Sequence, residues 1–218
     1  MIHWKNLQSL TLAVVVGGFV GLPAFAQEKS GAKKDDKSAG QPSEADMAMM
    51  MELAKPGENH KLLAQHVGTW TYKLKFWMSP DAPAQESSGT SVTREVFGGR
   101  YFISDVNGKM QMPGADGKMT DMDFKGMSTE AYDNVKKKFV ATWVDNMGTG
   151  IMMTEGSYDA SSKTFTYRGE VEMMPGMKTK VRELIKITDK DHHTLEWYED
   201  RGGNEVKTME INYTRSKS

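Results

Sequence analysis

The stretch GTWTYKLKF, residues 68–76, alternates large apolar side chains with polar ones. Trp70, Tyr72, Leu74 and Phe76 share one parity, while threonine and lysine occupy the positions between them. A period of two is typical of a β-strand that has one buried and one solvated face. The same period continues towards the C-terminus, so the sequence predicts an all-β domain from Gly68 onward.

Nine further alternating runs follow this strand, at residues 90–97, 101–106, 124–132, 139–144, 150–158, 164–171, 180–187, 194–198 and 206–213. The connectors between them are short and rich in turn-forming residues, which is typical of antiparallel hairpins. About ten strands without crossover helices must avoid free edges, and closure into an up-and-down β-barrel achieves this. We therefore expect a ten-stranded antiparallel β-barrel, with a two-sheet sandwich as the alternative.

The residues before the barrel fall into three segments. Residues 1–26 combine a charge at Lys5, an apolar run over 10–22 and small residues at Ala24 and Ala26, which is the form of a secretory signal peptide. Residues 27–42 contain no large apolar side chain and are predicted to be a disordered linker. A short helix is expected over 43–55, and a second one at the start of the barrel domain, which is predicted to span 56–218.

Composition argues against several classes of protein. The chain has no cysteine, so neither a disulfide nor a lipidated cysteine is available. After the signal, no apolar stretch reaches the roughly twenty residues that a membrane helix needs, so we expect a periplasmic or secreted protein without membrane insertion. Cleavage removes Lys5 and no acidic residue, so 28 basic residues become 27 against 29 acidic ones. This even balance gives no reason to expect nucleic-acid binding.

The two ends of the expected barrel carry a pair of motifs. Gly68-Thr69-Trp70 begins the first strand, and the last strand ends Tyr213-Thr214-Arg215. Arg215 shares the parity of Tyr213 and is expected to point inward, where it can stack on Trp70. This pairing resembles the calycin superfamily of lipocalin-like barrels, which implies that Gly68, Trp70 and Arg215 close the barrel.

A closer resemblance runs from residue 56 to residue 215. The matching stretches include PGENHKLL at 56–63, YDN at 132–134, TWVD at 142–145, GTGIM at 148–152 and MEINYTR at 209–215. Together they resemble the bacterial family filed as domain of unknown function 1579, which implies a calycin-like barrel and no particular reaction. The sequence contains no nucleophile elbow, phosphate loop or zinc-helix motif, so no catalytic residue is predicted.

Methionine and histidine raise two metal hypotheses. Eighteen methionines gather mainly in clusters at 47–51, 110–122, 147–153 and 173–177, and thioethers are soft ligands that suit Cu(I). Flexible filling of the core, or cover for an apolar ligand, is the favoured interpretation. Haem ligation by His192 or His193 is the other hypothesis, but both residues adjoin a predicted turn and are expected to be exposed. We therefore predict no cofactor and no tight metal site.

The inward parities define a candidate ligand site in the barrel. Its aromatic members are Tyr72, Trp143, Phe165, Tyr167, Trp197 and Tyr213, and its polar anchors are Glu183 and Arg94. Pockets for small ligands are mostly apolar, with a few polar groups that fix orientation. We therefore expect the lumen to bind a small apolar or amphipathic ligand. The alternative is a structural or envelope-stress accessory protein whose barrel is filled by its own side chains; the sequence leaves the oligomeric state open.

The signal peptide gives the first testable prediction. Since Ala24 and Ala26 are the small residues that signal peptidase requires, the exported protein should begin at Gln27. N-terminal sequencing of protein recovered from the periplasm or medium checks this, and an intact Met1 start there would contradict it.

Overall fold

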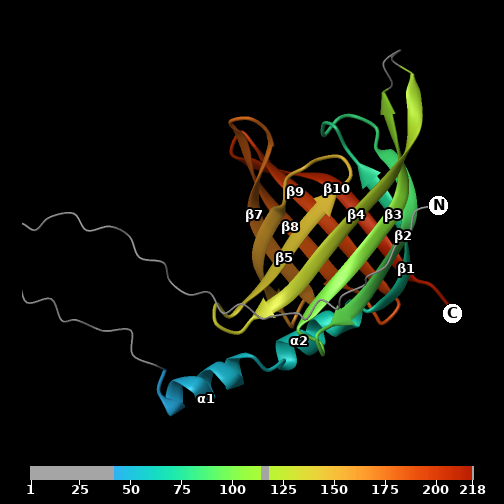
Figure 1. Ribbon diagram of the computed structural model, residues 1–218. Coiled ribbons are helices and arrows are strands. Elements are labelled where there is room, and N and C mark those ends of the chain that lie inside the picture. The colour runs from blue at the N-terminus through green and yellow to red at the C-terminus, as the bar shows by residue number, and fades with distance from the viewer. Residues whose placement is uncertain (1–41, 114–117, 218) are drawn as a thin grey trace, which may run out of the picture. The chain divides into compact units, whose positions relative to one another are not determined.

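The computed structural model describes residues 42–113 and 118–217. The chain divides into two units, 1–41 and 42–218. The predicted signal peptide and nearly all of the predicted linker lie outside the described residues. The elements of the second unit, labelled in Figure 1, are α1 (Glu44–Leu53), α2 (Glu58–Leu63), the 3-10 helix η1 (Ala64–His66), β1 (Gly68–Phe76), β2 (Gln85–Val96), β3 (Tyr101–Pro113), β4 (Met119–Asp133), β5 (Lys138–Asp145), β6 (Met152–Asp159), β7 (Thr164–Met174), β8 (Met177–Ile187), β9 (His192–Arg201) and β10 (Asn204–Arg215).

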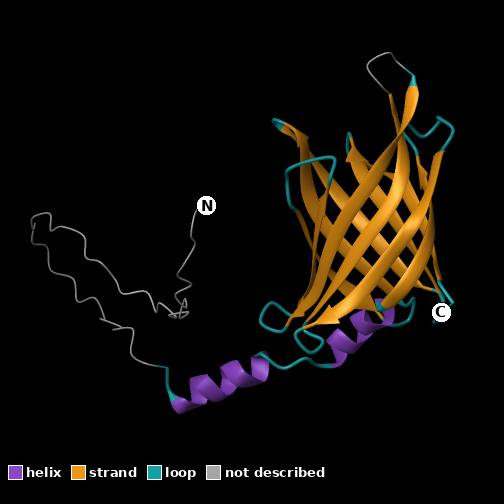
Figure 2. Ribbon diagram, turned by 45° about the vertical axis from the view of Figure 1, so that its right-hand side comes forward, coloured by secondary structure: helices purple, strands orange, loops and turns teal. Residues whose placement is uncertain are grey.

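The ten strands form one closed antiparallel barrel. Each strand pairs with its neighbours in sequence, and β1 pairs with β10 to complete the ring, so every strand has two partners (Figure 2). This confirms the predicted up-and-down barrel and excludes the sandwich. In the described part of the chain, neither α-helix has the length and hydropathy of a membrane span.

The hairpin of β3 and β4 is longer than predicted. The sequence placed the strands at 101–106 and 124–132 and treated the intervening methionine-rich segment as a loop. Instead, pairing continues to Pro113 and Met119, with Met110 directly opposite Met122. Figure 2 shows this hairpin extending beyond the other strands at the end of the barrel away from α2. The prediction failed because glycine lowers strand propensity, whereas pairing with the facing strand compensates for it.

The end of the barrel next to α2 is closed by a packed core. Leu63 of α2 is fully buried there, together with Phe102, Phe139 and Phe165 from three strands. The phenylalanine rings meet edge to face, with 5.1 Å between the centroids of Phe139 and Phe165. The short helices α2 and η1 therefore act as a plug at this end, the closed end of the barrel. At the opposite, open end the described chain has hairpin connections and no helix.

Arg215, the last residue of β10, joins three segments at the closed end. Its guanidinium carbon lies 4.0 Å from the centroid of the Trp70 ring. Its three nitrogens donate to backbone carbonyls: Nε to Lys190 at 2.8 Å, Nη1 to Val67 at 2.6 Å and Nη2 to Gln65 at 3.0 Å. Because Arg215 also pairs with Trp70 in the strand register, it fixes β10, β1 and η1 to one another.

The start of β1 is adapted to this contact. Gly68 has a φ of 135°, a conformation that side chains other than glycine rarely adopt, and a Cβ there would collide with Nη1 of Arg215. Two residues on, the Trp70 indole is almost fully buried and donates from Nε1 to the His66 carbonyl at 2.8 Å. Gly68 therefore leaves room for the Arg215 guanidinium, and the Trp70 ring packs against it.

A double-mutant cycle tests this closure. Trp70→Ala should destabilise the protein by about 3–5 kcal/mol through loss of a large buried ring. Arg215→Ala should cost about 2–3 kcal/mol through the lost cation–π contact and the carbonyls left without a donor. Since the two residues touch, urea unfolding should show the double mutant to be less destabilised than the sum. Arg94→Ala, which removes an exposed arginine elsewhere, should be additive with Trp70→Ala; additivity for Arg215 as well would contradict the closure.

Candidate functional site

The lumenal face of the barrel is set by strand alternation. Trp70 and Tyr72 face inward from β1, and the paired positions on β10 are Arg215 and Tyr213. Aromatic rings and several acidic side chains line the space between the closed and open ends. The side chains on this lumenal face include Trp70, Tyr72, Glu130, Trp143, Thr154, Tyr167, Glu183, His193, Trp197, Glu199, Arg201 and Tyr213.

The predicted site residues divide into two levels along the barrel. Phe165 and Tyr167 are completely buried in the core of the closed end, so they fill space there. Further towards the open end, Trp143, Trp197 and Tyr213 are only partly buried although they face inward. The lumen is therefore filled by side chains at the closed end, next to α2. Its upper part, towards the open end, keeps accessible surface.

Two lumenal rings lie flat against the barrel wall because glycines leave them room. A Cβ added to Gly89 or Gly108 would collide with the hydroxyl end of Tyr72, and one added to Gly126 would collide with the Trp143 indole. Trp143 is held further by its Nε1, which donates to Asp145 at 2.8 Å. Tyr72 also packs against Val106 and Ile211 in a second buried cluster, whereas Trp143 stays partly accessible.

Glu130 of β4 is a buried carboxylate with two partners. The hydroxyl of Tyr167 donates to Oε1 at 3.0 Å, and Nδ1 of His66 lies 3.2 Å from Oε2. Burial by itself raises the pKa of this carboxyl, but the charge and hydrogen bond of His66 and the Tyr167 hydroxyl outweigh it, so the pKa of Glu130 is lowered. Glu130 is therefore an ionised group whose needs are met inside the protein.

Glu183 of β8 is a carboxyl in a different situation. It pairs in register with Tyr167 on one side and Trp197 on the other, and it retains part of its accessible surface. No described residue donates a hydrogen bond to it. Burial, reinforced by the charge of Glu130, raises the pKa of Glu183 to about 8. At neutral pH this side chain is a neutral carboxylic acid that faces the lumen without a partner.

The structure places Arg94, the other predicted anchor, outside the barrel. Its side chain is half exposed on the outer face of β2 and lies 3.8 Å from Asp105. The predicted parity was wrong because the inward residues of β2 are the small ones, Ser91 and Thr93. Ser91 pairs with Trp70, whose ring already occupies the lumen at that level, so a larger inward residue has no room. The expected pair of Glu183 and Arg94 does not form.

His193 is also placed differently from the prediction. It was expected to be exposed, but its ring is buried at the closed end, stacked on Tyr213 and edge-on to Trp70, with 4.4 Å between the centroids in each pair. Burial lowers the pKa of His193 to about 3, so the imidazole is neutral. Neighbouring rings, including His66 at 5.3 Å, enclose it where a haem ligand would need an open face. The adjacent His192 is exposed as predicted.

Three buried polar atoms of the described residues lack a hydrogen-bond partner: Nε2 of His66, Nδ1 of His193 and Oγ1 of Thr154. Such atoms in a native protein are usually paired with water or a ligand. Thr154 lies on the lumenal face of β6, where the sequence had suggested no site residue. The sequence analysis also missed Glu130, which its shared parity with Phe124 could have indicated. His66 lies in a helix, so no strand pattern could have indicated it.

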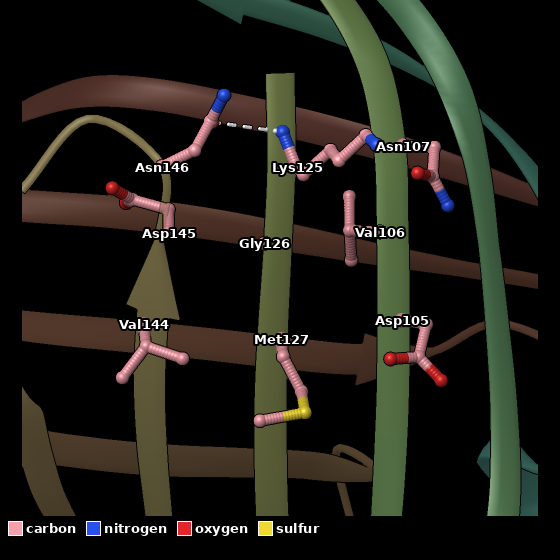
Figure 3. A pocket seen from close by; sticks show the side chains of 9 residues that line it. All are labelled: Asp105, Val106, Asn107, Lys125, Gly126, Met127, Val144, Asp145 and Asn146. Carbon is pink, nitrogen blue, oxygen red and sulfur yellow. Dashed lines mark hydrogen bonds between the residues drawn. The ribbon is translucent and has the colours of Figure 1, made fainter. Parts of the chain in front are cut away.

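A hollow on the outer face does not form part of this site. It has a volume of about 470 Å³, is shallow and open, and spans β3, β4 and β5 (Figure 3). Asp105, Asn107, Lys125 and Met127 line it, and these residues alternate with lumenal ones. The hollow therefore exposes the outer wall of the barrel and gives no access to Glu183.

The described residues contain no group of three or more His, Asp or Glu side chains placed to hold a metal ion. Many of the methionines are exposed, including the four at 47–51 and the three at 173–177. The absence of a tight Cu(I) site stays a prediction.

The raised pKa of Glu183 makes stability depend on pH. Between pH 4.5 and 8 the folded protein keeps a proton that an unfolded Glu183 releases, so the free energy of unfolding falls as pH rises, by at most about 1.4 kcal/mol per pH unit. Glu183→Gln removes this contribution. Urea unfolding at pH 6, 7 and 8 should show wild type losing about 1–3 kcal/mol relative to this variant. The exposed Glu86→Gln should follow wild type, and parallel curves for Glu183→Gln would contradict the assignment.

Comparison with known proteins bears on the fold and the family. Rv2717c from M. tuberculosis superposes with a TM-score of 0.53 and 13% identity, over 75% of this chain and 100% of that one. The S-type phycobiliprotein lyase CPES from Guillardia theta gives a TM-score of 0.48 and 10% identity, over 78% and 97%. Among curated proteins, none matches the sequence.

The likeness to Rv2717c is one of fold, because the identity is too low to carry more. The family described as "Protein of unknown function (DUF1579)" matches residues 55–215, which include all ten strands. This protein belongs to the DUF1579 family.

Proposed function

We propose that this is an exported binding protein whose barrel lumen holds a small molecule with an apolar body and one polar end. The observation that carries the proposal is the carboxyl of Glu183, which faces the lumen and has no hydrogen-bond partner among the described residues. A buried polar group without a partner costs free energy, and a ligand that pairs with it recovers that cost.

The surroundings of Glu183 suit the rest of such a ligand. Trp197 is its register partner, and Trp143 and Tyr213 leave apolar surface open in the same part of the lumen. Binding sites for small molecules combine apolar walls with a few polar groups in this way.

Access is from the end of the barrel opposite α2. The β1–β2, β5–β6 and β7–β8 connections lie at this end, where Met78 and Ile151 in the first two connections and Met173 near the end of β7 are exposed. Flexible methionine side chains can adjust to an apolar molecule that passes between them. Export rests on the signal-peptide pattern of residues 1–26.

The structural or accessory function is supported at the closed end, where the core is completely packed. Ligand binding depends on the upper lumen alone. A test of ligand binding must therefore change the upper lumen and leave the closed end intact.

Blocking the upper lumen tests the proposal. Ser128 faces inward beside Trp143, whereas the adjacent Met127 is exposed on the outer wall. Wild type should bind the neutral dye N-phenyl-1-naphthylamine with increased fluorescence, and Ser128→Phe should weaken its affinity roughly tenfold by filling the space. Met127→Phe adds the same ring outside and should leave affinity within about twofold. Thermal melts confirm that both variants fold; no dye binding by wild type, or equal effects of both changes, would refute the proposal.

A further inference from the structure

The inward-facing charges of the barrel are predominantly acidic. Apart from Glu95, which shares the inward parity but is exposed at the closed end, four acids face inward from the described strands: Glu130, Asp145, Glu183 and Glu199. By the same alternation, the described strands place only two basic residues on this face, Arg201 at the open end and Arg215 at the closed end. Between these two levels the strands provide no lysine or arginine to receive an anion.

Both arginines are already engaged. Arg215 donates to three backbone carbonyls and stacks on Trp70 at the closed end. Arg201 donates to Glu199 at 3.0 and 3.3 Å and to the Met78 carbonyl at 2.9 Å. Neither guanidinium is available to a molecule in the middle of the lumen.

Three of the four acids are engaged as well. Glu130 accepts from Tyr167, Asp145 from the Trp143 indole, and Glu199 from Arg201. Glu183 alone has no partner in the described structure. It is also flanked by rings, with Trp197 next to it in the register and Tyr213 nearby. The pKa of the Tyr213 hydroxyl is raised by burial first and then by the charge of Glu183.

We propose that the polar end of the lumenal ligand is a cation, a protonated amine or a quaternary ammonium group held by Glu183 and the rings beside it. This deepens the proposed function and rests on it. A carboxylate supplies the opposite charge, and the faces of tryptophan and tyrosine attract a cation further. An anionic ligand such as a fatty acid would instead meet Glu130, which is ionised, and would have no free basic residue to pair with.

Binding of such a cation is coupled to release of a proton. The groups around Glu183 are Tyr167 on β7, Trp197 on β9, Glu130 on β4 and Tyr213 on β10, and none of them is a base that could take its proton. When the ligand cation arrives, the proton of Glu183 leaves to solvent and the carboxylate pairs with the cation. An anionic or neutral ligand gives no such release.

Three probes with the same ten-carbon chain separate charge from apolar contact. They are decyltrimethylammonium, decanol and decanoate, titrated at pH 7 below their micelle concentrations into the mature protein. We expect the cation to bind roughly tenfold or more tightly than the other two. Calorimetry in two buffers with different ionisation enthalpies should show about one proton released per cation bound, because Glu183 begins mostly protonated.

Variants assign the effect to Glu183. Glu183→Gln should lose both the preference for the cation and the proton release, while it keeps decanol binding. Glu86→Gln, which makes the same change on the outer face of β2, should behave as wild type. Tighter binding of decanoate, or an unchanged preference in Glu183→Gln, would overturn this inference and leave the proposed function standing. Failure of all three probes to bind would overturn both.

Discussion

The structure depends on one contact, the seam between β1 and β10 at the closed end. An open ten-stranded sheet would expose two edges with unpaired backbone groups, and the lumen would not exist. Arg215 prevents this by joining the seam to the helical plug through the carbonyls of Gln65 and Val67, to the β8–β9 connection through the Lys190 carbonyl, and to the face of Trp70. Because Trp70 is buried in the core and also donates to the His66 carbonyl, loss of the seam would disturb the plug as well.

A second constraint divides the barrel into a tightly packed closed end and an upper part that packs around Tyr72 but keeps accessible surface at Trp143 and Trp197. At the closed end the phenylalanines and Tyr167 meet across the axis and exclude space. At the level of Tyr72 and Trp143, glycines on neighbouring strands let the rings lie along the wall. A ring against the wall covers apolar surface without crossing the lumen, so the same residue type closes one half of the barrel and lines the other.

The sequence was sufficient for the fold because alternation is local. Ten period-two runs separated by turn residues leave few ways to arrange the chain, and the barrel followed from them; the family followed from the resemblance of separate motifs such as residues 56–63 and 209–215. Parity was insufficient on β2, where Val92 and Arg94 face outward, because the large rings of β1 dictate small inward neighbours. The contact of His66 with Glu130 was beyond reach for another reason, since it joins a helix to a strand 64 residues away. Side-chain sites that depend on the packing of distant elements are not encoded in any local period.

Glu130 and Glu183 show why an unpartnered carboxyl in this barrel is informative. They face the same lumen, yet the pKa of Glu130 is lowered by His66 and Tyr167, whereas that of Glu183 rises to about 8. The ionised form of Glu183 is therefore disfavoured in the folded protein. A glutamine or leucine would fill the position without that cost, so the acid does not serve stability. Functional sites are where proteins tolerate such local costs, and under the proposed function the partner that Glu183 lacks within the chain is the ligand.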